Sequence, residues 1–167
     1  MADNIILVGF MGTGKTAVSK QLAKKLDWQQ IDIDDLIEET ANKKISDIFA
    51  ENGEQYFRDL ETEALRRIIS LKNHIVSTGG GAVLREENMK IMKQAGVVIC
   101  LSAEPEIIYD RVKTASHRPL LQTEDPLQKI KDLLEFRAPF YEKADYMIDT
   151  SYLSVDQVVK KILKYIK

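Results

Sequence analysis

A glycine-rich segment that directly follows an apolar run is the feature that most restricts how this chain can fold. Residues 5–8 read Ile-Ile-Leu-Val and predict a buried strand, and residues 9–16 read Gly-Phe-Met-Gly-Thr-Gly-Lys-Thr. This pattern is typical of a loop whose backbone N–H groups surround phosphates at the N-terminus of a helix. Lys15 would add a positive charge between the outer phosphates, and Thr16 would offer its hydroxyl to Mg²⁺. The competing interpretation is a flexible surface turn.

Length and composition describe one ordinary globular domain, residues 1–167, with 44% apolar residues and a net charge of −2. Because no broad basic face is implied, we expect no nucleic-acid partner. Cys100 is the only cysteine and is expected in the core, and His74 and His117 lack metal-ligand spacing. The start of the chain does not resemble a signal peptide, and no apolar run is long enough to span a membrane. These features predict a cytoplasmic enzyme.

Strand and helix signals alternate along the chain, which predicts an α/β fold with a parallel sheet and helices on both faces. We expect strands at residues 5–8, 30–32, 75–77, 97–101 and 146–148, and helices at residues 16–26, 36–41, 54–71, 86–94, 105–113, 127–137 and 155–166, with a short helix opened by Ser46. Residues 115–125 lack periodicity and predict a surface loop. The helix at residues 127–137 should end near Ala138, because the residue before Pro139 avoids helical geometry.

Two carboxylates follow the second expected strand. Asp32 and Asp34 bracket Ile33, and in an extended chain both side chains would point the same way. The carboxyl ends of parallel strands border the ligand crevice, so both would lie near the phosphates. One could hold Mg²⁺ through water, and the other could accept a proton from an attacking hydroxyl. The alternative makes them solvated acids or helix caps, with Asp34 or Asp35 as the cap of the next helix.

Arginine is scarce, since only seven of the 24 basic residues are Arg, and planar recognition of carboxylate or phosphate is a task for Arg. Arg58 lies three residues before Glu61, which could hold its guanidinium in place; the alternative is a surface ion pair. Residues 79–81 are three successive glycines, which indicates a backbone that a ligand approaches closely, or else a plain tight turn.

Two further arginines lie close to prolines. Arg118 lies in the irregular stretch, where a lid closing over a phosphate could carry it to stabilise charge during transfer. Arg137 ends its expected helix just before Pro139, where the helix dipole alone favours a cation. The alternative for Arg118 is a solvated loop residue.

Taken together, these segments resemble the shikimate kinases, a family of the nucleoside monophosphate kinase-like P-loop group. The resemblance extends along nearly the whole chain, through the phosphate loop, Asp32-Ile33-Asp34, Phe57-Arg58 with Glu61, the glycines at 79–81, residues 118–121 and residues 137–141. One departure is residues 150–154, Thr-Ser-Tyr-Leu-Ser, where family members often carry an Arg-Asn-Pro-like adenine loop.

The resemblance implies a three-layer α/β/α sandwich with a five-stranded parallel sheet of order 2-3-1-4-5 and a P-loop kinase fold. It implies a substrate-binding region at about residues 33–61 and a lid at about residues 112–125. The implied activity is ATP-dependent phosphorylation of the shikimate 3-hydroxyl, in the route to chorismate and the aromatic amino acids. A monomer is expected, with ATP and shikimate as its small-molecule partners and Mg²⁺ as its cofactor.

The resemblance also implies roles for individual residues. Lys15, Asp34 and Arg118 would be catalytic, with Asp34 taking the proton and the two cations facing the transferred phosphoryl group. ATP would be bound by Gly12, Thr13, Gly14, Lys15, Thr16, Ala17, Arg111 and Arg118, shikimate by Asp34, Arg58, Gly79, Gly80, Gly81 and Arg137, and Mg²⁺ by Thr16 and Asp32. Within these sets, Arg111 would pack on adenine, and Arg58 and Arg137 would clamp the shikimate carboxylate.

Three other functions compete with this interpretation. A related kinase could act on gluconate or a nucleotide. A GTP-dependent switch would read guanine with an Asn-Lys-x-Asp element after a late strand, but Asn42 and Lys43 lie too early and no Asp follows at the required place. A non-catalytic adapter with the same fold would have no need of Lys15, Asp34 and Arg118.

Overall fold

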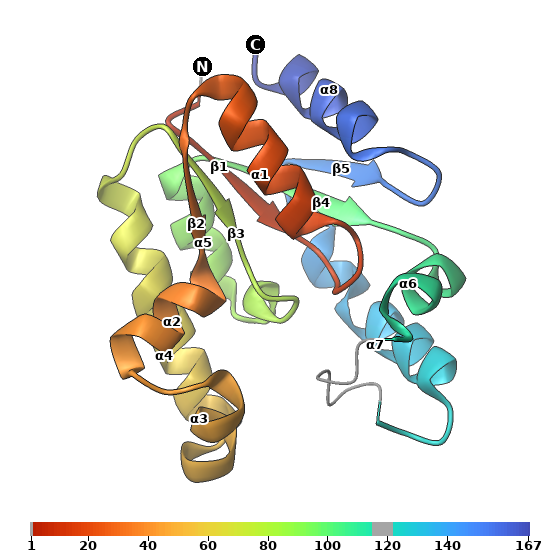
Figure 1. The fold of residues 1–167 in the computed structure, drawn as a ribbon. Helices are drawn as coiled ribbons and strands as arrows, with labels where there is room; N and C mark the ends of the chain where they lie inside the picture. Colours follow the sequence, from red (N-terminus) through yellow and green to blue (C-terminus); the bar gives the residue numbers. More distant parts are fainter. Residues whose placement is uncertain (1, 115–121) are drawn as a thin grey trace.

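The computed structural model describes residues 2–114 and 122–167, and it forms one parallel sheet between two layers of helices (Figure 1). The strands are β1 (Asn4–Val8), β2 (Gln29–Asp32), β3 (His74–Ser77), β4 (Val97–Ser102) and β5 (Tyr146–Asp149). The helices are α1 (Lys15–Leu26), α2 (Ile33–Ala41), α3 (Ile45–Asn52), α4 (Glu54–Arg67), α5 (Glu86–Ala95), α6 (Pro105–Val112), α7 (Pro126–Tyr141) and α8 (Val155–Tyr165), with short 3-10 turns η1 (Ile68–Ser70) and η2 (Ala82–Leu84).

The sheet has the expected strand order, β2-β3-β1-β4-β5, with every neighbouring pair parallel. The central strand β1 pairs Ile5 with Ile75 of β3 and with Val97 of β4. All five residues of β1 are buried, as a strand covered on both faces requires. Because the strands are parallel, their carboxyl ends open on one edge, where the phosphate loop, Asp32 and the glycine run all follow.

Successive residues of β1 supply the two halves of the core. Ile5 and Leu7 pack under α1 and α8, while Ile6 and Val8 pack toward α4, α5, α6 and α7. Figure 1 shows α1 and α8 on one side of the sheet and α4 and α5 on the other. The alternation follows from the two-residue period of a strand, and it confirms the three-layer arrangement. None of the helices in the described ranges is long and apolar enough to cross a membrane.

The cap of α2 is Asp32, which the alternative interpretation allowed as a helix cap, and not Asp34 or Asp35. The Asp32 carboxylate accepts a hydrogen bond of 3.1 Å from the backbone N–H of Asp35. Asp34 and Asp35 instead lie in the first turn, where negative charge is favoured by the helix dipole. The expectation that Asp32 and Asp34 share an extended segment was therefore wrong, because the helix begins at Ile33.

Helix α7 also differs from the prediction, since it continues through Pro139 to Tyr141 instead of ending near Ala138. A proline so near the C-terminus of a helix removes a single backbone hydrogen bond. The final turn carries two buried side chains, Arg137 and Tyr141. Their packing outweighs the local preference of the residue before proline. Similarly, the helix expected at residues 54–71 ends at Arg67 and continues only as the η1 turn.

Candidate active site

The loop between β1 and α1 adopts the conformation that its glycines predict. Gly12 and Gly14 have φ angles of 76° and 99°, which favour glycine over other residues. A Cβ atom on Gly12 would also lie only 2.8 Å from a methyl group of Val112. The Lys15 ammonium folds back over the loop and donates to the carbonyls of Gly9 (2.5 Å) and Phe10 (2.9 Å). The loop is thus a preformed cradle at the N-terminus of α1.

A cavity of about 400 Å³ opens beside this loop. It is lined by Gly12, Thr13, Gly14, Val18, Arg111, Thr150, Leu153, Ser154, Val155 and Val158. Part of the lining comes from the segment after β5, at the place where the resemblance implies an adenine loop. The Thr150 hydroxyl donates to the carbonyl of Thr13 at 2.8 Å, so this segment is fastened directly to the phosphate loop. The cavity has the size and mixed lining of a nucleotide site.

Arg111 joins the same two segments from α6. Its guanidinium donates to the carbonyl of Gly12 at 3.0 Å and to the carbonyl of Thr150 at 2.8 Å. The structure therefore brings Arg111 to the wall of the cavity predicted for ATP. Thr16 and Ala17 lie at the start of α1 with exposed side chains, next to the cradle.

The oxygens predicted for Mg²⁺ are the hydroxyl of Thr16 and the carboxylate of Asp32. The Asp32 carboxylate also accepts a hydrogen bond of 3.1 Å from the Ser77 hydroxyl at the end of β3. In the described part of the chain, no group of three or more His, Cys, Asp or Glu side chains could enclose a metal. Two hard oxygen ligands fit Mg²⁺, which keeps several waters and takes its remaining ligands from substrate phosphates.

The three glycines after β3 each leave room for one charged side chain. A Cβ atom on Gly79 would lie 3.1 Å from a carboxylate oxygen of Asp34, and one on Gly80 would lie 3.1 Å from the guanidinium of Arg137. A Cβ atom on Gly81 would overlap the guanidinium of Arg58. Because the φ angles of these glycines are not in the left-handed region, the glycines serve close approach and not a special turn.

The two arginines predicted to clamp a carboxylate converge on this loop. Arg58 pairs with the buried Glu61, with 2.9 Å between Nη1 and Oε1, so the expected pairing is confirmed. Arg137 is only 8% exposed, and its guanidinium lies 5.5 Å from the centre of the Phe10 ring in the phosphate loop. Burial raises the pKa of Glu61, while Arg58, Arg85 and Arg137 oppose that rise.

Asp34 lies between the phosphate cradle and the arginines. Burial, with the negative charges of Asp32 and Glu61, raises the pKa of Asp34 from 3.8 to about 7, and Lys15 and Arg58 act in the opposite direction. A carboxyl group with a pKa near neutrality is suited to exchange a proton with a hydroxyl substrate.

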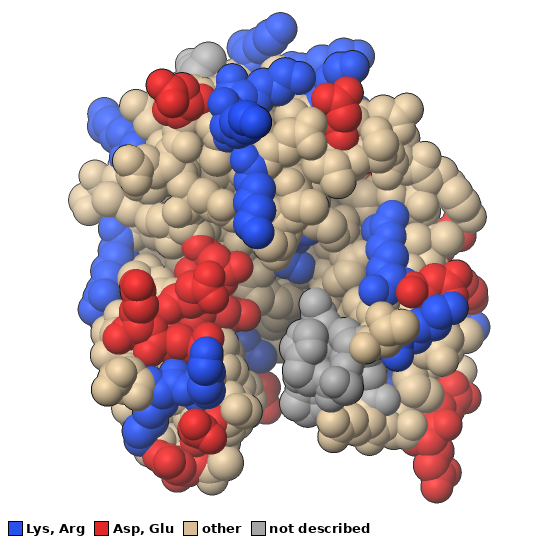
Figure 2. Space-filling view, in the orientation of Figure 1, with Lys and Arg blue, Asp and Glu red and all other residues tan. Residues whose placement is uncertain are grey.

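Four buried atoms of this cluster have no hydrogen-bond partner within the described residues. They are Oδ1 of Asp34, Nε of Arg58, Oε2 of Glu61 and Nε of Arg137. Buried polar atoms are normally paired, so a cluster of unpaired ones marks a place where a polar ligand or water completes the site. Figure 2 shows that this face is hollowed between the part that holds α2 and α3 and the rest of the molecule, with basic side chains visible in the hollow.

One predicted site residue, Arg118, lies outside the described residues, as does half of the expected lid at residues 112–125. Sequence reasoning also missed residues that the structure places in the site. The Phe10 ring packs under Arg137, and Thr150, Leu153 and Val155 line the nucleotide cavity. For Thr150 and Leu153 the sequence signal was their place after the last strand, where the resemblance implies an adenine loop; Val155 was expected only as part of a helix.

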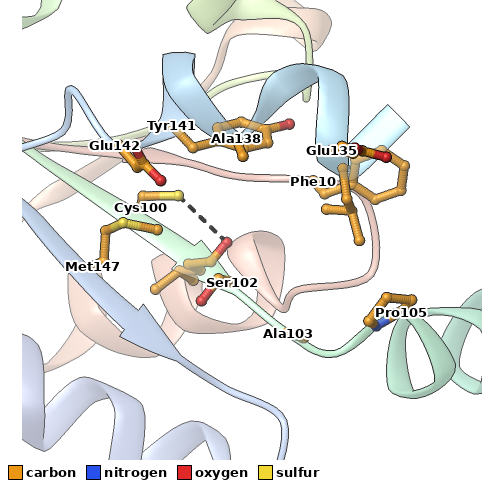
Figure 3. A pocket seen from close by; sticks show the side chains of 12 residues that line it. Phe10, Cys100, Ser102, Ala103, Pro105, Glu135, Ala138, Tyr141, Glu142 and Met147 are labelled. Carbon is orange, nitrogen blue, oxygen red and sulfur yellow. Dashed lines mark hydrogen bonds between the residues drawn. The ribbon is translucent and has the colours of Figure 1, made fainter. Parts of the chain in front are cut away.

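A further cavity of about 340 Å³ lies between β4 and α7 and has a mainly apolar lining (Figure 3). Phe10, Cys100, Tyr141 and Met147 are among the side chains around it. Cys100 is buried, as predicted, and burial raises its thiol pKa to about 12. No predicted substrate, nucleotide or metal residue lines this cavity.

The profile of the shikimate kinase family matches residues 11–167. The chain belongs to the shikimate kinase family. It is 50% identical to a shikimate kinase of Thermodesulfovibrio yellowstonii over 161 residues, 96% of this chain and 93% of that protein. It is 46% identical to a shikimate kinase of Caldanaerobacter subterraneus over 165 residues, 98% of this chain and 96% of that protein.

Solved structures of shikimate kinases share the fold. The enzyme of Acinetobacter baumannii in complex with shikimate is 41% identical, with a TM-score of 0.92 over 98% of this chain and 92% of that chain. The enzyme of Aquifex aeolicus is 35% identical, with a TM-score of 0.84 over 96% of this chain and 94% of that chain. The family membership accords with a P-loop kinase fold of the observed strand order.

Proposed function

We propose that this shikimate kinase family member transfers the γ-phosphoryl group of ATP to the 3-hydroxyl of shikimate, giving shikimate 3-phosphate and ADP on the route to chorismate and the aromatic amino acids. The observation that carries the proposal is convergence. Arg58, Arg137 and Asp34 meet on the glycines after β3, and Lys15 is close enough to Asp34 to lower its pKa. A cation cluster that recognises a carboxylate thus adjoins a phosphate cradle.

The guanidinium groups of Arg58 and Arg137 bind the carboxylate of shikimate. Arg58 already uses one edge to hold Glu61, which fixes its plane, and Arg137 is fixed by burial against Phe10. Their unpaired Nε–H groups supply donors that a carboxylate can accept. Gly79, Gly80 and Gly81 let the substrate lie close to the backbone.

Asp34 binds the hydroxyl groups of shikimate and removes the proton from the hydroxyl that attacks. Its unpaired Oδ1 is the acceptor for that proton. With a pKa of about 7, Asp34 is a stronger base than an ordinary carboxylate and is still partly ionised at neutral pH. In phosphoryl transfer the protein contributes chiefly by positioning the reactants and by neutralising charge. Proton removal by Asp34 adds to these contributions but is not the main one.

The nucleotide half positions ATP. Backbone N–H groups of residues 12–17 bind the phosphates, Lys15 exchanges its loop carbonyls for phosphate oxygens, and Arg111 borders the adenine side. Thr16 and Asp32 hold Mg²⁺, which neutralises phosphate charge when it is bound. Arg118 is assigned to the transferred phosphoryl group from its sequence pattern alone. Location in the cytoplasm, a monomeric state and a single domain over residues 1–167 stay predictions.

A coupled assay of ADP release tests the proposal. Purified protein would be given ATP and Mg²⁺ with shikimate, gluconate or a nucleoside monophosphate as acceptor. We expect turnover with shikimate and a product whose phosphate is on the 3-oxygen, identified by phosphorus NMR. Turnover only with gluconate or a nucleotide would refute the proposal, and tight GTP binding without any acceptor turnover would favour a switch protein.

A further inference from the structure

Each of the two helices that carry an arginine is linked by hydrogen bonds to the glycine loop, and each link, here called a tie, starts from a side chain one turn after the arginine. On α7 the arginine is Arg137 and the tie is made by Tyr141. On α4 the arginine is Arg58 and the tie begins at Thr62. Residues four apart lie on the same face of a helix, so each tie acts beside its guanidinium.

The tie from α7 is a single hydrogen bond. The hydroxyl of Tyr141 donates to the backbone carbonyl of Gly80 at 2.7 Å. Tyr141 is 5% exposed, and burial raises its pKa to about 12, so the hydroxyl keeps its proton at neutral pH. Gly80 is the glycine that lies against Arg137, so the bond joins the loop to the helix at the point where the guanidinium passes.

The tie from α4 runs through an intermediate side chain. The hydroxyl of Thr62 lies 2.7 Å from Oδ1 of Asn88 at the start of α5, and Nδ2 of Asn88 donates to the carbonyl of Ala82 at 3.0 Å. Asn88 is fully buried and Thr62 is 3% exposed. Ala82 directly follows Gly81, the glycine that lies against Arg58.

The loop's own backbone bonds do not reach either helix. Ala82 N–H donates to the carbonyl of Gly79 and Leu84 N–H to the carbonyl of Gly81, so both bonds close within the loop and η2. A planar carboxylate held by two guanidinium groups needs their separation and planes fixed closely, because bidentate hydrogen bonds weaken steeply with misalignment.

We propose that Thr62, Asn88 and Tyr141 are positioning residues that set the spacing of Arg58 and Arg137 for the substrate carboxylate. This inference depends on the proposed function, since the carboxylate is that of shikimate. Thr62 and Asn88 act through the loop, whereas the Tyr141 hydroxyl bonds the loop and also interacts directly with the Arg137 guanidinium. The two ties are independent, one on each side of the glycines.

Three single variants test it in the full-length protein: Tyr141→Phe, Thr62→Val and Asn88→Ala. The first two remove one hydroxyl with little change in shape. We expect each variant to raise KM for shikimate by about threefold to tenfold, the range of one modest hydrogen bond, with KM for ATP changed less than about twofold. The assays are run well below the unfolding temperature of every variant, which is measured separately.

Two matched controls separate positioning from stability. Asn4 is also fully buried, and its amide donates to the carbonyls of Leu71 (2.7 Å) and Ala95 (2.9 Å) at the opposite end of β1. Asn4→Ala should lower the unfolding temperature and leave both KM values unchanged. The exposed Tyr165 of α8 stacks on Tyr146, with 4.3 Å between the ring centroids, and has no role in the site, so Tyr165→Phe should change neither quantity.

Combining the variants tests the two-tie arrangement. Thr62→Val and Asn88→Ala interrupt the same tie, so the double variant should have about the KM for shikimate of the more affected single variant. Adding Tyr141→Phe to Thr62→Val should multiply the two effects. If the wild type does not phosphorylate shikimate, the proposed function fails. If it does, but KM for shikimate stays at the wild-type value in Tyr141→Phe and Thr62→Val, or rises together with KM for ATP, this inference is overturned.

Discussion

The nucleotide half and the acceptor half of the site hold their charged side chains in opposite ways. In the nucleotide half, Lys15 and Arg111 donate to backbone carbonyls of the phosphate loop and of the segment after β5. The cations there are satisfied before any ligand arrives. In the acceptor half, Asp34, Arg58, Glu61 and Arg137 each keep one buried polar atom without a partner in the described residues.

This contrast indicates which half depends on its ligand. An unpaired buried polar atom costs on the order of 1–3 kcal/mol, and a ligand that pairs it removes that cost. A ligand with a carboxylate and nearby hydroxyl groups would pair these atoms in the acceptor half, or replace the water that pairs them in the free protein. Arg111 in the nucleotide half exchanges existing hydrogen bonds for new ones, so its substitution should have a smaller effect.

The largest expected effect comes from removing the negative charge of Asp34 in the acceptor half. Asp34→Asn removes the proton acceptor and should lower kcat by about 10²- to 10⁴-fold, while the Kd for ATP changes less than about twofold. In the wild type, kcat/KM should rise with pH through about 7 as Asp34 loses its proton, and this rise should be absent in the variant. The exposed neighbour Asp35 gives the control, since Asp35→Asn should retain kcat. A near-normal kcat in Asp34→Asn would remove Asp34 from the mechanism.

The next effect concerns the geometry of the cations. Arg58→Lys keeps the charge but loses the planar fork, so KM for shikimate should rise about tenfold or more while KM for ATP is retained. Arg66, two turns further along α4, pairs with Glu63 and Glu87 on the surface and supplies the control. Arg66→Lys should leave both constants unchanged, and an equal effect of the two substitutions would contradict the clamp.

A third effect concerns the stability of the ligand-free protein, which the burial of Asp34 makes dependent on pH. Because the pKa of Asp34 is raised in the folded protein, the native state holds this proton more tightly than the unfolded chain does between pH 4 and pH 7. The free energy of unfolding of the ligand-free protein should therefore fall as pH rises through that window. Asp34→Asn should be more stable than the wild type at pH 8 by on the order of 2 kcal/mol and equally stable at pH 4, as measured by urea unfolding. A difference that does not depend on pH would contradict this account.

The smallest effect belongs to the nucleotide half. Arg111→Lys loses the paired hydrogen bonds that join Gly12 to Thr150, so KM for ATP should rise by about threefold. KM for shikimate should stay unchanged. Arg67 makes one hydrogen bond to Thr40 on the surface, and Arg67→Lys serves as the control. If Arg111→Lys raised KM for ATP as much as Arg58→Lys raises KM for shikimate, the proposed difference between the two halves would be contradicted.

Much of the fold was predictable because it depends on local patterns. The apolar runs located all five strands, and the phosphate loop located the start of α1 to within one residue. The strand order came from the family resemblance, since periodicity does not specify which strands pair. The cap of α2 was not assigned to one residue because three nearby aspartates are equally good caps, and only the position of the first helical residue distinguishes them.

The rest of the site depends on contacts that connect distant parts of the chain. Arg58, Arg137 and Asp34 could be singled out by residue type, but their meeting on the glycine loop is a product of the fold. The hydrogen bond from Tyr141 to Gly80 spans 61 positions and the one from Thr62 to Asn88 spans 26. Local sequence patterns predict neither bond. For the same reason the continuation of α7 through Pro139 was not foreseen, because it depends on packing.

The buried thiol of Cys100 makes this protein convenient for fluorescence work. Its pKa of about 12 leaves almost no thiolate at neutral pH, so a maleimide dye should not label Cys100. A cysteine introduced at an exposed site, for example Glu124→Cys, would then be the single reactive position without any change to the native residue. A dye attached there would occupy one known position in an otherwise unaltered enzyme.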